Sequence, residues 1–153
     1  MNLKVRFWLL SLALVGAAIL SACGGSTGGG TTPAGGGGGA AALAVTAQDS
    51  LKFEPPTLTA KANTATTVNV KNAGALQHNW VVTKPEDADK VDQAAAAKTG
   101  DATGVAGVLS GGKLINAGAN ESISVNLPAG TYTYLCTFPG HYQAGMKGTL
   151  TVN

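Results

Sequence analysis

A glycine-rich segment, Gly24 to Ala42, divides the chain and limits how much of it can form a hydrophobic core. Ten of the 22 glycines lie between Gly24 and Gly39, and the segment has no charged residue. Such a composition buries too little apolar surface to fold. The remaining residues, 43–153, number 111, which is enough for one compact domain and too few for a multidomain enzyme.

The first 22 residues have the three parts of an export signal. Lys4 and Arg6 form a basic head, the apolar run from Phe7 to Leu20 follows, and small residues precede Cys23. As a helix, this run would span about 21 Å, which is less than the roughly 30 Å of a bilayer core. We therefore predict a cleaved signal peptide over residues 1–22 and an extracytoplasmic, periplasmic protein.

Cys23 closes the tetrapeptide LSAC, which resembles a bacterial lipobox. In lipoproteins with that pattern the cysteine is acylated and the chain is cleaved just before it. A conventional signal peptide with an incidental cysteine is the alternative. More than one acyl chain on Cys23 would anchor the protein stably to a membrane. Residues 23–42 would then be a flexible tether, whose 19 residues after the cysteine reach about 25 Å.

Cleavage also changes the charge of the protein, because Lys4 and Arg6 are lost with the signal. The whole chain has 10 Lys and Arg against 8 Asp and Glu, so the part after residue 22 has a formal charge of zero. Nucleic acids and anionic membranes attract proteins through an excess of basic residues. The charge balance therefore argues against nucleic-acid binding.

From residue 43 onward, short segments rich in threonine and valine alternate between apolar and polar residues. Residues 121–127, for example, place Ile123, Val125 and Leu127 on one face, and Asn, Gly and Pro turns separate such segments. This pattern predicts an all-β domain, either an antiparallel β-sandwich or a Greek-key barrel. The predicted strands are 64–70, 77–83, 121–127, 131–136 and 148–152.

The segment from Pro85 to Lys98 has a different pattern, which predicts one short helix between strands. It has proline in its first turn, Glu86, Asp87 and Asp89 near its start, an alanine run and Gly100 just beyond its end. Its acidic residues could be a docking patch for a basic partner. A solvated helix face is the more common reason for such a cluster.

Cys136, His141 and Met146 are spaced five and five along one predicted loop, and His78, the other histidine, lies on a separate predicted strand. In an oxidising compartment an unpaired thiol needs a function, and acylation of Cys23 would leave Cys136 without a partner. A thiolate, two imidazoles and a thioether are the ligand set of a mononuclear blue-copper centre. Zinc also binds Cys and His, but a thioether adds little for zinc. We therefore predict one copper ion, Cu(I) or Cu(II), at these four residues.

Two motifs resemble the cupredoxins, closest to azurin and closer still to the auracyanins of filamentous anoxygenic phototrophs. They are HNW, His78 to Trp80, and CTFPGHYQAGMKGTLTV, Cys136 to Val152. The resemblance covers residues 43–153 and implies a cupredoxin-like Greek-key β-sandwich or barrel with one short helical excursion. The chain departs from azurin in lacking its disulfide, and Gln77 stands where azurin has a glycine. The family's copper ligands fall on His78, Cys136, His141 and Met146.

The resemblance also implies roles for residues around the ligands. In azurin-like proteins the asparagine after the first histidine hydrogen-bonds across to the cysteine loop. Here that asparagine is Asn79, which would brace Thr137 and the sulfur of Cys136 and so tune the metal. In the family, the ring edge of the second histidine, here His141, is exposed in an apolar patch through which electrons pass.

The function that the resemblance implies is that of a membrane-tethered, monomeric one-electron carrier with no small-molecule substrate. The implied partners are a quinol-oxidising complex as donor and a cytochrome as acceptor. A copper storage or delivery protein is the alternative, although Met146 is the one methionine besides Met1, and delivery proteins offer exposed soft ligands. A copper enzyme would need a further copper centre, and the chain has only 2 histidines. We therefore expect a carrier rather than an enzyme.

Overall fold

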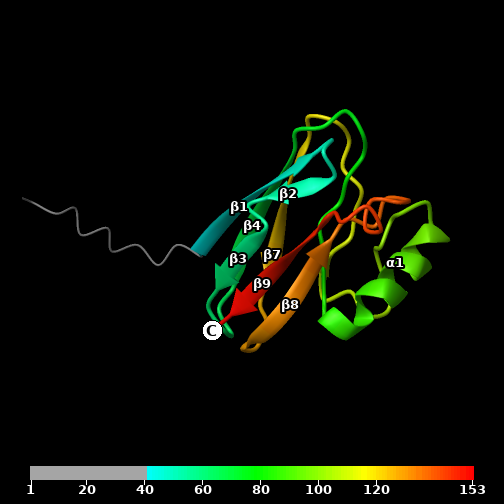
Figure 1. Ribbon diagram of the computed structural model, residues 1–153. Helices are drawn as coiled ribbons and strands as arrows, with labels where there is room; N and C mark the ends of the chain where they lie inside the picture. The colour runs from blue at the N-terminus through cyan, green and yellow to red at the C-terminus, as the bar shows by residue number, and fades with distance from the viewer. Residues whose placement is uncertain (1–40) are drawn as a thin grey trace, which may run out of the picture. The chain divides into compact units, whose positions relative to one another are not determined.

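The computed structural model describes residues 41–153, which form a sandwich of two β-sheets (Figure 1). The predicted all-β sandwich with one short helix is confirmed, and the two sheets remain separate instead of closing into a barrel. The predicted signal, Cys23 and nearly all of the predicted tether lie outside the described residues. Among residues 41–153, no helix is both long and apolar enough to cross a membrane.

The first sheet contains a parallel strand pair that the sequence pattern did not predict. β1 and β4 run parallel, whereas the two outer pairs are antiparallel. β1 pairs from Ala41 onward, opposite Thr66, so the strand begins two residues before the predicted domain start at residue 43. In order across the sheet, the strands are β2 (Lys52–Glu54), β1 (Ala41–Gln48), β4 (Thr66–Asn72) and β7 (Asn120–Val125).

The second sheet also mixes strand directions, because its edge strand β3 runs parallel to β9 while the other pairs are antiparallel. The chain passes from β2 in the first sheet to β3 in the second before it returns as β4. Such crossings between layers allow parallel neighbours without a hairpin. In order, the strands are β3 (Thr57–Ala60), β9 (Lys147–Val152), β8 (Gly130–Leu135), β5 (Val81–Thr83) and β6 (Ser110–Gly111).

Aromatic side chains fill the space between the sheets. Trp80 is fully buried, and its ring centroid lies 5.5 Å from that of Tyr134 on β8. Tyr134 in turn lies 5.4 Å from Phe53 on β2, so this contact joins the two sheets. Ile123 and Val125 are buried as the alternation predicted. The core therefore fixes the second sheet against the first, and with it the loop between β8 and β9.

The predicted helix covers the outer face of the second sheet. It begins as a single 3₁₀ turn, η1 (Pro85–Asp87), and continues as α1 (Ala88–Ala96), ending two residues before the predicted end. Gly100 closes the helix, since its N–H donates to the carbonyl of Ala95 at 2.9 Å with a φ of 96°. Figure 1 shows α1 beside β8, where its apolar residues pack against Val81 and Leu135.

The strand predicted over residues 77–83 is wrong in its first half. Only Val81–Thr83 is a strand, and His78 makes an isolated bridge to Ile115. The reason is Asn79, whose backbone N–H points at the sulfur of Cys136, 3.5 Å away, and so leaves the strand ladder.

Gly148 provides the space that the ring of Tyr134 occupies across the β8–β9 ladder. A Cβ atom at Gly148 would overlap the Tyr134 ring, whose hydroxyl donates to the carbonyl of Pro55 at 2.7 Å. We expect Gly148→Ala to lower the free energy of unfolding by about 1–3 kcal/mol, because it overpacks the core. Urea denaturation of the metal-free protein measures this loss.

Gly130→Ala is the matched control on the same pair of strands. A Cβ at Gly130 would lie 3.4 Å from the ring of Tyr132, which is an ordinary contact. Its free energy of unfolding should change by less than about 1 kcal/mol. Equal effects of the two substitutions would contradict the packing assigned to Gly148.

Candidate metal centre

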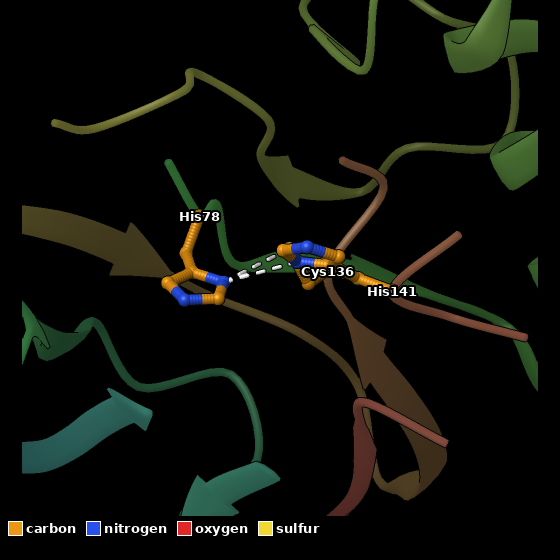
Figure 2. A group of neighbouring side chains, drawn as sticks. All are labelled: His78, Cys136 and His141. Atoms are coloured by element: carbon orange, nitrogen blue, oxygen red, sulfur yellow. Dashed lines mark hydrogen bonds between the residues drawn. The ribbon is translucent and has the colours of Figure 1, made fainter. Parts of the chain in front are cut away.

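Three side chains from two distant parts of the sequence lie close together (Figure 2). Cys136 directly follows β8, His141 lies on the loop between β8 and β9, and His78 precedes β5. β5 and β8 are paired neighbours, with Val81 opposite Leu135, so the ladder brings the histidine segment alongside the cysteine. All three side chains are buried, and His141 is 5% exposed.

The donor atoms of these residues form a small triangle. The two Nδ1 atoms of His78 and His141 are 3.2 Å apart. The sulfur of Cys136 lies 3.7 Å from Nδ1 of His78 and 3.5 Å from Nδ1 of His141. A point equidistant from all three lies about 2 Å from each, close to the lengths of metal–imidazole and metal–thiolate bonds. The triangle therefore fits one metal ion.

Met146 is held next to this triangle by the backbone of the loop. Its N–H donates to the carbonyl of His141 at 2.9 Å, and its carbonyl accepts from the N–H of Cys136 at 3.1 Å. The side chain is fully buried. The loop thus closes on itself, and the thioether belongs to the same buried end of the sandwich as the other donors.

Burial sets the protonation of the donors. It raises the pKa of the Cys136 thiol to about 11, against the opposing hydrogen bonds from the backbone of Asn79 and Phe138. It lowers the pKa of both His78 and His141, and for His78 the neighbouring imidazole lowers it further. Near neutral pH the imidazoles are therefore uncharged ligands, whereas the thiol loses its proton only to a bound cation.

Asn79 joins the segments that surround the sulfur. Its backbone N–H points at the sulfur of Cys136, and its side chain exchanges two hydrogen bonds with Thr137, at 2.9 Å to the hydroxyl and 2.8 Å from the backbone N–H. The amide of Asn79 also donates to the carbonyls of Gly100 and Gly112. Asn79 and Thr137 are both fully buried. The segments at Gly100, Gly112 and Thr137 are therefore fixed around the cysteine through one side chain.

A carboxylate that the sequence did not single out lies behind His78. Asp49 accepts a hydrogen bond from the N–H of Ala75 at 2.9 Å, and its Oδ1 lies 3.9 Å from Nε2 of His78. That Nε2 is buried and makes no hydrogen bond among the described residues. A Cβ at Gly74 would collide with the Asp49 carboxylate. Glycine at position 74 therefore permits the approach of the carboxylate to the ring.

Two acidic residues of α1 contact the ligand loop, which the sequence reading also missed. The hydroxyl of Tyr142 donates to Asp89 at 2.8 Å, and the amide of Gln143 donates to Asp92. The signal was present in the sequence, because Asp92 interrupts the apolar stripe on the buried face of the helix. An aspartate is expensive at a position where helical periodicity calls for an apolar residue.

Comparison with known proteins agrees with this geometry. Residues 40–153 match the family described as copper binding proteins, plastocyanin/azurin family. Auracyanin-B of Chloroflexus aurantiacus is 44% identical over 116 residues, which cover 69% of this chain and 49% of that protein, so the matched part spans about half of its length. Auracyanin-A of the same organism is 33% identical over 163 residues and all of both chains. Azurin of Bordetella pertussis is 34% identical over 124 residues, 69% of this chain and 79% of that protein.

Solved structures give the same result. The dithionite-reduced auracyanin of Roseiflexus castenholzii superimposes with a TM-score of 0.69 at 32% identity, over 75% of this chain and 99% of that one. Auracyanin A of Chloroflexus aurantiacus, described as a blue copper protein, gives 0.68 at 30% identity, over 75% and 100%. The predicted resemblance is confirmed, and the chain belongs to the plastocyanin/azurin family of copper-binding proteins.

Proposed function

We propose that this protein is a one-electron carrier whose single copper ion is bound by His78, Cys136, His141 and Met146. The observation that carries the proposal is the buried triangle of one sulfur and two nitrogens, with sides of 3.2 to 3.7 Å. When bound, copper supplies the chemistry, changing between Cu(II) and Cu(I) as one electron enters or leaves. The thioether and thiolate suit Cu(I), and the imidazoles suit both states.

The chain's own residues keep this geometry fixed. Asn79 holds Thr137, the residue after Cys136, and its N–H stabilises a thiolate at the sulfur. The loop from Cys136 to Met146 is closed by backbone hydrogen bonds that involve no ligand side chain. A ligand set held in this way rearranges little when the charge on the metal changes, which favours rapid electron transfer.

Electrons pass, in this proposal, at the edge of His141, which is 5% exposed and packs against the ring of Phe138 at 4.7 Å. Leu76, two residues before His78 in the sequence, is an apolar side chain that is 47% exposed. A domain without net charge docks there through apolar contact, in a small and transient interface with redox proteins. By the resemblance, these are a quinol-oxidising complex and a cytochrome. Both histidines serve this centre, so we assign no catalytic reaction to the protein.

The proposed location is the outer side of a membrane, with the chain anchored by acylated Cys23. The sequence supports this through the basic and apolar signal, the tetrapeptide that ends in Cys23, and the uncharged glycine-rich segment. The glycine-rich segment after Cys23, within the predicted residues 23–42, is the proposed tether. Such a tether would let the copper domain reach partners within the same membrane.

The copper-loaded protein should show an intense thiolate-to-copper absorption band near ~600 nm, which this ligand set produces. Cys136→Ser should abolish the band, because it removes the thiolate. Cys23→Ser is the matched control and should retain it. Survival of the band in Cys136→Ser would refute the ligand assignment.

Copper binding near pH 7 should release one proton. The Cys136 thiol has a pKa of about 11 and is protonated at that pH, whereas burial lowers the pKa of both histidines, so they have no proton to release. Calorimetry in buffers of different ionisation enthalpy counts the protons. Zn²⁺ should give the same count, which excludes oxidation of the thiol by Cu²⁺ as the source. A count near zero would contradict a protonated thiol.

The anchor can be tested in a bacterium that processes lipoproteins. The wild-type protein should sediment with membranes and resist a high-salt wash, because acyl chains bind through apolar burial. Cys23→Ser should appear in the soluble extracytoplasmic fraction, and Cys136→Ser should behave like the wild type. Membrane retention of Cys23→Ser would rule out the lipid anchor.

A further inference from the structure

Helix α1 holds the ligand loop from outside at two consecutive residues. Tyr142 and Gln143 directly follow His141, and both donate hydrogen bonds to carboxylates of the helix. The acceptors, Asp89 and Asp92, are three residues apart and so lie on neighbouring positions of one helix face. The part of the loop between the second histidine and the methionine is therefore tied to a helix.

The helix is itself fixed to the strand that ends at the cysteine. Its residues Val91 and Ala95 pack against Leu135, the residue before Cys136. At the other end, the carbonyl of Gly100 accepts hydrogen bonds from the side chains of Asn79 and Thr137. Because α1 is anchored in this way, its bonds to Tyr142 and Gln143 fix the position of the loop relative to the cysteine.

Asp92 is the unusual member of this contact. It is 5% exposed and occupies a place in the apolar stripe of the helix, whereas Gln143, its partner on the loop, is exposed. Burial raises the pKa of its carboxyl group, and the hydrogen bond from Gln143 opposes that shift. A buried carboxylate is screened poorly by salt.

We propose that Asp92 is a positioning residue of the copper centre, which fixes the loop between His141 and Met146 through Gln143 and whose negative charge lowers the copper reduction potential. A nearby negative charge stabilises the oxidised site, because Cu(II) carries one more positive charge than Cu(I). The inference rests on the copper ligands proposed above. The proposal gives α1 a role at the copper centre in addition to its packing against the second sheet.

Four substitutions in the full-length protein separate the charge from the hydrogen bond. Asp92→Asn removes the charge and keeps an oxygen that can accept from Gln143. Asp92→Ala and Gln143→Ala remove the bond. Glu86→Gln is the matched control, because it removes an equal charge at an exposed position of η1, six residues earlier.

At pH 8, Asp92→Asn should raise the copper reduction potential by more than Glu86→Gln does and leave the absorption band unchanged. Asp92→Ala and Gln143→Ala should release copper to a chelator roughly 10-fold faster than the wild type, whereas Asp92→Asn should not. In the metal-free protein, the amides of Gly145 and Met146 should exchange with deuterium faster in the two alanine variants. If Asp92→Ala does not fold, Gln143→Ala tests the same hydrogen bond, because it removes the other partner at an exposed position.

Equal potentials in Asp92→Asn and Glu86→Gln would overturn the role of the charge. Copper release and amide exchange that are the same in Gln143→Ala as in the wild type would overturn the positioning role. Failure of the proposed ligands is a separate result, because it appears as a wild-type protein without the absorption band. Amide exchange in the metal-free protein tests the positioning even then.

Discussion

The hydrogen bonds of Asn79 are the interaction on which the metal centre depends. This residue follows His78 and precedes Trp80, so it lies between a ligand and the core. Its amide and backbone reach Cys136, Thr137 and the loop carbonyls that follow α1. A buried amide with all its partners specifies one arrangement, because each lost bond would leave a polar group without water or partner. The same bonds interrupt the strand, so the irregular backbone at residues 78 to 80 is part of the site.

The sandwich and helix α1 hold different donors of the site. The sandwich fixes His78 and Cys136, since β5 and β8 are paired and their inner side chains are packed around Trp80 and Tyr134. His141 and Met146 lie on a loop, which a sheet alone leaves free to move. Backbone bonds close that loop, and helix α1 contacts it from outside. Helix α1 therefore fixes the loop that contains His141 and Met146, as the paired strands fix His78 and Cys136.

The sequence predicted the parts of the structure that have a local signature. Alternation identified the strands around Ile123 and Leu150, and the spacing of Cys136, His141 and Met146 identified the donor set, because both patterns are short-range. The parallel pairing of β1 with β4 has no such signature, since it depends on where the chain crosses between layers. The partners of Asp49, Asp89 and Asp92 are also remote in sequence. The burial of Asp92 was not predicted, although its place in an apolar stripe was a signal for it, and no pattern identifies Gln143 as its partner.

The geometry of the donor triangle is determined by the groups packed behind it. Two unprotonated imidazoles and a neutral thiol within 3.7 Å gain little from one another, and Nε2 of His78 has no hydrogen-bond partner among the described residues. The stability of this arrangement must come from the groups behind it. Asn79 and Thr137 satisfy each other, Gly100 is bonded to both, and Gln143 is bonded to Asp92. None of these bonds involves a donor atom of the triangle, so the fold itself fixes where the donors lie. Ligands whose positions are fixed by the fold move little when an electron arrives, and this links the hydrogen bonds of the fold to the rate of electron transfer.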